Sequence, residues 1–106
     1  MVTDPELQAR AALRVRVGDS LRLMGVDGAD GLSRIAVVGG IAEAVARAAF
    51  VFEAAPEKMA LKQAIFDEIE AIAPATAVRC FNTSVMPITE IMAGLRDRTR
   101  ALGTHW

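Results

Sequence analysis

Phe50-Val51-Phe52-Glu53-Ala54-Ala55-Pro56-Glu57 is a short apolar run closed by a proline and a glutamate. It predicts a β-strand over 50–55, followed by a helix over 57–72. The apolar residues of that helix recur at helical spacing and predict one buried side, made of Leu61, Ile65, Phe66, Ile69 and Ile72. Ala77-Val78-Arg79-Cys80-Phe81 predicts a second strand. Short apolar runs that alternate with helices are typical of βαβ units and a parallel sheet.

The alternation extends on both sides of this centre. Upstream, the run Ile35-Ala36-Val37-Val38 predicts a strand, and 41–48 is Ala-rich and predicts a helix. Downstream, 88–95 predicts a short helix, and an apolar segment near 100–105 predicts the last strand. The sequence therefore predicts an α/β fold.

The N-terminal third of the chain has a different pattern. Thr3-Asp4-Pro5-Glu6 is typical of a helix start, and the helix is predicted to end near Met24. The segment 27–31 is rich in Gly and Asp and predicts a turn-rich connector.

The composition fits one small domain. The chain has 106 residues, of which 53% are hydrophobic and 24% charged, with a net charge of −1. Scattered Lys and Arg predict no nucleic-acid partner, and no apolar stretch approaches the roughly 20 residues of a membrane helix. The single cysteine, Cys80, excludes an internal disulfide and favours a reducing, cytoplasmic compartment. No Cys/His/Asp cluster has metal-ligand spacing, so we expect no metal.

Polar residues follow several of the predicted strands. In a parallel sheet, ligands bind at the carboxyl ends of the strands. The positions at those ends are Gly39, Ala54 to Glu57, Asn82 to Ser84, and His105. Three of these four ends carry polar side chains, so we expect a ligand site there.

These strand ends also resemble a known family. The chain resembles the NAD-binding domain of the 3-hydroxyacyl-CoA dehydrogenases, whose close relatives act on gulonate and carnitine. The residues that carry the resemblance are the 50–57 stretch, Lys62, Asn82-Thr83-Ser84 with Pro87-Ile88-Thr89, Gly103-Thr104-His105, and Val2-Thr3-Asp4-Pro5.

The resemblance covers nearly all of the chain and implies a partial NAD-binding domain over 1–106. Its fold would be a Rossmann-like, three-layer arrangement with a mostly parallel sheet of three or four strands. Residues 1–31 would be the helix and connector after the family's second strand, and 32–106 would be the βαβαβαβ portion.

Two residues take catalytic roles by this resemblance. His105 would be the general base that takes the proton of the substrate 3-hydroxyl while hydride leaves for NAD, because an imidazole titrates near neutral pH. Ser84 would hydrogen-bond the substrate oxygen. The alternatives are a solvated histidine and a serine that caps the helix beginning near Pro87.

Four further residues would bind NAD by the same resemblance. Asp4 would hold the adenosine ribose, Glu57 would contact the nicotinamide end, and Lys62 and Asn82 would make further contacts. The alternatives are a cap of the first helix for Asp4, a first-turn glutamate for Glu57, an exposed helical lysine for Lys62, and a turn residue for Asn82.

The sequence also departs from the family. It contains no Gly-x-Gly-x-x-Gly turn, and Gly39-Gly40 does not replace it because the spacing differs. Phe81 stands where the family usually has Ser. We therefore expect a domain truncated at both ends, which lacks the first strand, the Gly-rich turn and the helical C-terminal domain, and which is inactive alone.

A missing first strand has a structural consequence, because that strand lies at the centre of the doubly wound sheet. Either the run at Ile35 moves beside Phe50 and gives a four-stranded sheet, or the exposed edge at Phe50 recruits another chain by self-association.

Two functions follow from the sequence. The first is a fragment of an NAD-dependent oxidoreductase of fatty-acid metabolism that acts on a 3-hydroxyacyl-CoA, or on a small 3-hydroxy acid of the gulonate or carnitine type. The second is a non-enzymatic module that associates with a partner chain.

Overall fold

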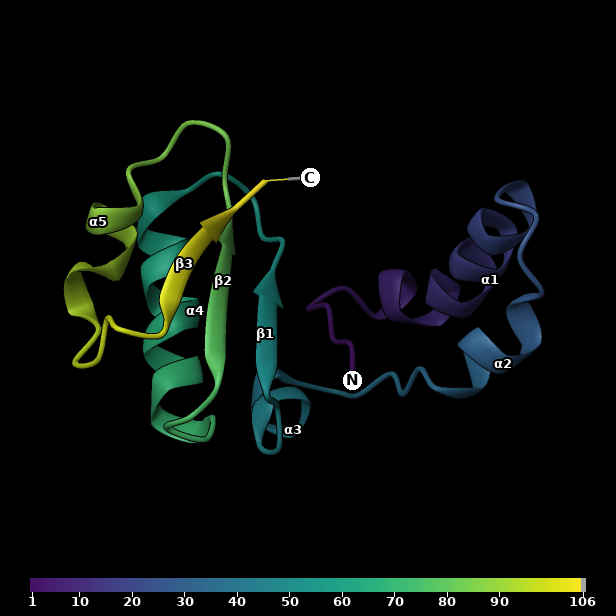
Figure 1. Ribbon diagram of the computed structural model, residues 1–106, viewed down its shortest axis with the longest axis horizontal. Coiled ribbons are helices and arrows are strands. Elements are labelled where there is room, and N and C mark those ends of the chain that lie inside the picture. The colour runs from purple at the N-terminus through teal and green to yellow at the C-terminus, as the bar shows by residue number, and fades with distance from the viewer. Residues whose placement is uncertain (106) are drawn as a thin grey trace. The chain divides into compact units, whose positions relative to one another are not determined.

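A computed structural model describes residues 1–105 of the chain. Their contacts divide into two compact units, of which unit 1 covers 1–44 and unit 2 begins at Val45 (Figure 1).

Unit 1 contains the helices α1 (Leu7–Leu23) and α2 (Gly28–Ser33). The first helix ends where the sequence predicted, and Gly25 follows with a φ of 71°. The predicted connector over 27–31 is wrong, because most of it lies in α2. The Asp27 carboxylate accepts the backbone N–H of Ala29 at 3.1 Å and thereby caps that helix.

The run at Ile35 forms less structure than the sequence predicted. A single parallel bridge joins Val37 to Val2, with the N–H of Val2 donating to Ala36 and the N–H of Val38 donating to Val2, both at 2.9 Å. The backbone groups of a strand need partners on a neighbouring strand. Val2 supplies such partners at a single position of this run. The four-stranded sheet with this run beside Phe50 is therefore wrong for the described residues.

Unit 2 is built on a three-stranded parallel sheet in the order β1-β2-β3. Val51 pairs with Arg79 and Arg79 with Ala101, which sets the register of all three strands. The strands are β1 (Phe50–Glu53), β2 (Val78–Asn82) and β3 (Ala101–Thr104). This confirms the predicted α/β fold with a small parallel sheet.

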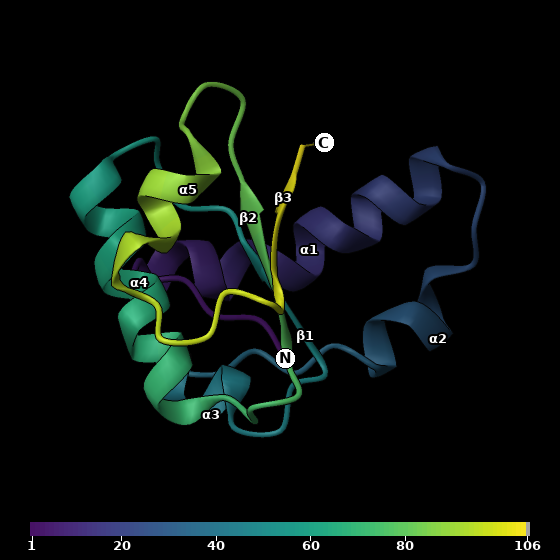
Figure 2. The same ribbon diagram turned by 60° about the vertical axis from the view of Figure 1, so that its left-hand side comes forward.

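Helices cover one face of this sheet (Figures 1 and 2). The long helix α4 begins later than predicted, so Glu57 lies before it and is not a first-turn residue. The elements are α3 (Ile41–Val45), which leads into unit 2, and α4 (Met59–Ile72), α5 (Ile88–Ile91) and the 3-10 helix η1 (Met92–Gly94).

The core of unit 2 lies between α4 and the sheet. Phe66 of α4 and Phe81 of β2 are both 0% exposed, and their ring centroids are 3.9 Å apart. Lys62 and Ile69 continue the buried stripe of α4 one turn away on either side. The prediction that Leu61 and Ile72 are buried is wrong, because they are 38% and 37% exposed, and Lys62 takes an inward position beside Leu61.

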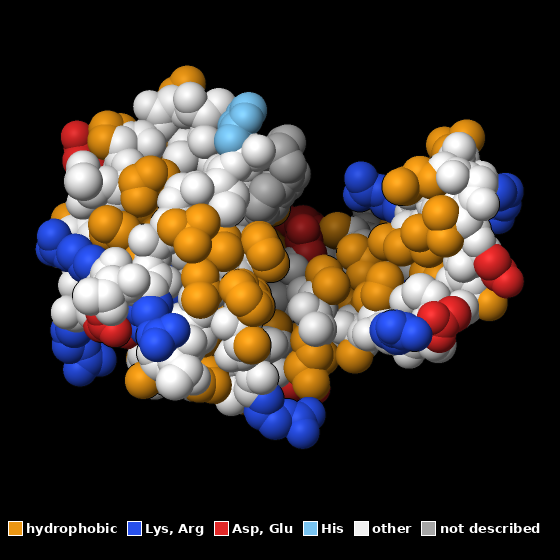
Figure 3. All heavy atoms as spheres, viewed as in Figure 1, with side chains coloured by type: hydrophobic (Ala, Val, Ile, Leu, Met, Phe, Trp, Pro, Cys, Tyr) orange, Lys and Arg blue, Asp and Glu red, His pale blue; other side chains and the backbone are white. Residues whose placement is uncertain are grey.

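The other face of the sheet carries exposed apolar side chains. Phe50 and Phe52 are each 62% exposed, with ring centroids 6.5 Å apart, and Leu102 is 45% exposed. Hydrophobic side chains gather over this part of unit 2 in Figure 3. Cys80 lies among them and is buried, as the sequence predicted, and burial raises the pKa of its thiol.

In the described chain, no helix combines the length and apolar character needed to span a bilayer.

Candidate functional site

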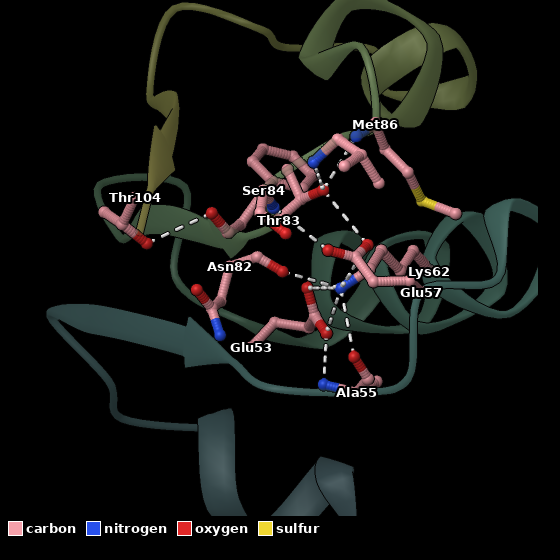
Figure 4. Close-up of polar contacts among 11 residues, drawn as sticks. Glu53, Ala55, Glu57, Lys62, Asn82, Thr83, Ser84, Met86 and Thr104 are labelled. Atoms are coloured by element: carbon pink, nitrogen blue, oxygen red, sulfur yellow. Dashed lines mark hydrogen bonds and ion pairs between the residues drawn. The ribbon is translucent and has the colours of Figure 1, made fainter. Parts of the chain in front are cut away.

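The carboxyl ends of the three strands meet at one edge of the sheet. Asn82 at the end of β2 pairs with Thr104 at the end of β3, and Glu53 ends β1. The Thr104 hydroxyl donates to the carbonyl of Phe81 at 3.1 Å, and the N–H of Thr83 donates to the carbonyl of Thr104 at 3.3 Å. Hydrogen bonds therefore join the ends of β2 and β3 at the edge where the sequence predicted a ligand site (Figure 4).

Glu57 joins the segment after β1 to the segment after β2. Its carboxylate accepts the backbone N–H of Ser84 and the hydroxyl of Thr83, both at 3.0 Å (Figure 4). The Ser84 N–H is the main reason that the pKa of Glu57 lies below its ordinary value of 4.5. Partial desolvation opposes the shift, while Thr83 and the positive charges of Lys62 and His105 add to it. Glu57 is thus a carboxylate held ionised beside His105.

Ser84 contributes its backbone to this contact and keeps its side chain available. Its residue is exposed, and its hydroxyl makes no hydrogen bond within 1–105. The residue before α5 is Pro87, so the alternative of Ser84 as the cap of that helix is wrong. Thr83 closes the turn instead, because its hydroxyl oxygen accepts the N–H of Met86 at 2.9 Å.

Lys62 lies beneath this edge and is fully buried. Its ammonium donates to both carboxylate oxygens of Glu53, at 2.9 and 3.0 Å, and to the carbonyls of Ala55 at 3.1 Å and Asn82 at 2.8 Å. The side chains of Lys62 and Glu53 are 0% and 2% exposed. The alternative of an exposed helical lysine is therefore wrong.

Glu53 and Thr83 are two residues of the site to which the sequence assigned no individual role. The Glu53 carboxylate also accepts the N–H of Ala55. A signal for Glu53 did exist, because it occupies an inward position of an alternating strand, and a buried carboxylate needs a cation as partner. Thr83 lies at a predicted strand end between two candidate residues, but nothing in the sequence indicates that its hydroxyl bonds Glu57.

The structure brings five of the six predicted site residues together in unit 2. His105 follows β3, is exposed, and lies close enough to Glu57 to lower its pKa. Asn82 is half-buried, and its carbonyl receives the Lys62 ammonium. Asp4, the sixth residue, belongs to unit 1, where its carboxylate accepts the N–H of Glu6 at 2.8 Å just before α1.

Polar groups from three segments gather at one edge of the sheet. The Ser84 hydroxyl, the Asn82 side chain and His105 stand at the strand edge where a parallel sheet receives ligands, and Glu57 adds an acceptor beside them. The 106 residues contain no Gly-x-Gly-x-x-Gly motif. Within 1–105, no group of three or more His, Cys, Asp or Glu could hold a metal ion.

Known proteins resemble this chain over most of its length. It is 32% identical over 105 residues to the L-carnitine dehydrogenase of Streptomyces griseus, a match that covers 96% of this chain and 31% of that protein. It is 36% identical over 75 residues to a probable 3-hydroxyacyl-CoA dehydrogenase of Caenorhabditis elegans, covering 71% of this chain and 25% of that protein. The chain thus spans a third or less of these relatives.

Solved structures agree with these relatives. The Escherichia coli 3-hydroxybutyryl-CoA dehydrogenase is 28% identical and superposes with a TM-score of 0.79, over 98% of this chain and 23% of that one. A diketoreductase is 25% identical, with a TM-score of 0.88 over 98% of this chain and 40% of that one.

The family match covers the helices of unit 1 and the whole of unit 2. Residues 8–106 match the family described as "3-hydroxyacyl-CoA dehydrogenase, NAD binding domain". This confirms the resemblance at the strand ends and the prediction of NAD as the cofactor. The chain belongs to the 3-hydroxyacyl-CoA dehydrogenase family and represents its NAD-binding domain.

Proposed function

We propose that the strand edge of unit 2 is the nicotinamide end of the cofactor site in an NAD-dependent dehydrogenase of 3-hydroxy acids. The observation that carries this proposal is the convergence of Glu57, Ser84 and His105 at the carboxyl ends of one parallel sheet. In this proposal both units, over 1–106, belong to one partial NAD-binding domain.

The proposed chemistry is the oxidation of a 3-hydroxyl to a ketone. Bound NAD supplies a hydride acceptor. The Ser84 hydroxyl donates a hydrogen bond to the substrate oxygen, for which it has no competing partner in the described chain. His105 accepts the hydroxyl proton on its imidazole, and the carboxylate of Glu57 lies nearby.

The remaining site residues serve the cofactor. Glu57 contacts the nicotinamide end, and Lys62 and Asn82 make further contacts with the cofactor, since all three groups meet at the carboxyl edge. Asp4 accepts the hydroxyls of the adenosine ribose through the carboxylate that now receives the N–H of Glu6. The absence of a Gly-rich turn from these residues leaves the phosphates without their usual N–H donors, so we expect NAD binding in the millimolar range.

The substrate proposed is a 3-hydroxyacyl-CoA or a small 3-hydroxy acid of the carnitine or gulonate type. The matches to acyl-CoA and carnitine dehydrogenases support both classes. A role in fatty-acid metabolism and a cytoplasmic location, which the single buried thiol favours, complete the proposal. A C-terminal helical domain would supply the rest of the substrate pocket.

A titration of the isotope-labelled chain with NAD tests this function. We expect the backbone amide resonances of Glu57, Asn82, Ser84 and His105 to shift together with one dissociation constant, and the resonance of Asp4 to shift with them. Shifts confined to other residues, or none at several millimolar NAD, would overturn the proposal.

A second candidate function is association through the edge of β1. In the described sheet, β1 pairs with β2 alone, and Phe50 beside that edge is 62% exposed. Unpaired strand edges recruit further strands. Light scattering of the purified chain measures whether it is a monomer or a dimer. A monomer at high concentration contradicts association, and a dimer that the Phe50→Lys substitution dissociates supports it.

A further inference from the structure

Burial of apolar side chains fixes β3 less than the other two strands of unit 2. Each of β1 and β2 contains buried residues, whereas all four residues of β3 are half-buried or exposed. In the described sheet β3 pairs with β2 alone (Figure 1). The register of a strand is set strongly where one of its faces is buried and weakly where none is. Because His105 directly follows β3, the register of this strand decides where the imidazole stands.

Hydrogen bonds from α4 hold the segment that leads into β3. The Glu70 carboxylate accepts the backbone N–H of Arg96 at 3.0 Å and that of Asp97 at 3.1 Å. The Glu70 side chain is only 10% exposed, so these bonds compete little with water. The two carboxylate oxygens thus bind two successive amides and fix the chain just before Ala101, where β3 begins.

Arg79 of β2 binds the same segment. Its Nη1 donates to the carbonyl of Asp97 at 3.1 Å, and its Nη2 lies 3.9 Å from the Glu70 carboxylate. Its backbone N–H donates to the carbonyl of Arg100, the residue before β3, at 2.8 Å. The residue is 2% exposed. Both the N–H and the carbonyl of Asp97 are therefore bound, the first by α4 and the second by β2.

The packing of Gly103 limits which registers are possible. A Cβ at this position would come within 2.8 Å of Ile88 Cδ1 on α5. A slip of β3 by two residues would bring Ala101 or His105, each with a Cβ, to this place. Such a slip would also move the imidazole about 7 Å along the strand, and a slip of one residue would turn every side chain of β3 to the opposite face.

We propose that Glu70, with Arg79 as its partner, is a positioning residue of His105 and acts by setting the register of β3. This inference rests on the proposed function, because it explains how the base assigned there is placed. Arg79 pairs with Ala101 at the start of β3, while His105 follows the end of that strand. The two residues therefore act on the base through the strand and from its opposite end.

Nuclear Overhauser effects in the labelled chain without NAD test the proposal. The contact of Cys80 with Leu102 reports the pairing of β2 with β3, and that of Cys80 with Phe52 reports the pairing of β1 with β2. We compare the wild type, Glu70→Met and the matched control Glu68→Met, an exposed glutamate of the same helix. We expect Glu70→Met to weaken only the first contact, by about twofold or more, because several registers then exchange. Glu68→Met should change neither contact.

The same spectra report the effect on the base. We expect the backbone amide resonance of His105 to shift in Glu70→Met and to stay in place in Glu68→Met. A residue that only stabilises the fold would lower the midpoint of urea unfolding and leave the β2–β3 contact of the folded chain at wild-type strength. That result, or an unshifted His105 resonance, would overturn the positioning role.

A milder variant decides if Glu70→Met does not fold. Glu70→Gln keeps the shape of the side chain but leaves one carbonyl oxygen for the two amides of Arg96 and Asp97. A weakened contact of Cys80 with Leu102 in Glu70→Gln supports the proposal, and wild-type strength contradicts it. Because no NAD is present, a chain that fails to bind NAD would contradict the proposed function and leave this result unaffected.

Discussion

The Glu57 carboxylate accepts the backbone N–H of Ser84 at 3.0 Å, and this bond spans 27 positions in the sequence. It holds together the segments that follow β1 and β2. A carboxylate that accepts N–H and O–H donors is stabilised in its charged form, which agrees with the lowered pKa of Glu57. The site therefore has a fixed negative charge next to the exposed His105.

The contacts of Glu57 predict that alanine substitutions at two neighbouring hydroxyl residues affect the pKa of Glu57 differently. Thr83→Ala removes a side-chain donor to Glu57, so we expect the pKa of Glu57 to rise. Ser84→Ala keeps the backbone N–H, so we expect the pKa to stay where it is. Carboxyl resonances followed through a pH titration give both values. A higher pKa of Glu57 in Ser84→Ala, with an unchanged pKa in Thr83→Ala, would contradict the observed contacts.

Acid should destabilise unit 2. Burial raises the pKa of Glu70, but the N–H groups of Arg96 and Asp97, with Arg79, outweigh it and the net pKa is lowered. A carboxyl group whose folded pKa is lowered stabilises the fold above its unfolded pKa and loses that contribution as the pH falls through the folded value.

We therefore expect thermal stability to be constant from pH 7 to about 5 and to fall below 4.5, the ordinary value for both Glu57 and Glu70. Glu70→Gln should lower stability at pH 7 and weaken the dependence in acid. Melting curves at pH 7, 4.5 and 3 check this. If Glu70→Gln loses as much thermal stability in acid as the wild type, Glu70 is not a source of the pH dependence.

Substitution of Lys62 should strongly destabilise the fold. Breaking a buried ion pair by removing one partner leaves an uncompensated charge, so Lys62→Met should lower the free energy of unfolding by about 3–5 kcal/mol. The exposed Lys58→Met should change it by less than about 0.5 kcal/mol. Urea unfolding measures both. Equal stability of the two variants would be incompatible with the buried pair of Lys62 and Glu53.

Gly103 lies where a side chain would collide with α5. A Cβ at this position would come within 2.8 Å of Ile88 Cδ1, so Gly103→Ala should cost about 1–3 kcal/mol through overpacking. Gly94→Ala is the control in the same unit, because the atoms nearest its Cβ, from 2.9 Å, belong to the carboxylate of the exposed Asp67, which can turn away. We expect it to cost less than about 0.5 kcal/mol. The reverse order in urea unfolding would contradict the packing of α5 on β3.

The sequence predicts unit 2 better than unit 1. Apolar runs and helical spacing locate β1, α4, β2 and β3 because each buries one face against the others. The run at Ile35 is likewise apolar, but within 1–105 its strand pairing is limited to one bridge with Val2. A local pattern cannot reveal that a strand lacks a partner.

The candidate site shows the same limit. Strand ends can be read from the sequence, and they located Glu57, Ser84 and His105. The burial of Lys62 is also encoded, because 62, 66 and 69 share one face of α4, but lysine is almost never fully buried without a counter-ion. Only the structure shows that Glu53 supplies one.

The two halves of NAD test the central claim most directly. Nicotinamide mononucleotide and adenosine monophosphate are titrated separately into the labelled chain, and backbone amide shifts are recorded. We predict that the nicotinamide half shifts Glu57, Ser84 and His105 and leaves Asp4 unchanged, while the adenosine half leaves those three unchanged. Shifts of Glu57, Ser84 and His105 by the adenosine half, or by neither half, would contradict the assignment of this edge to the nicotinamide end.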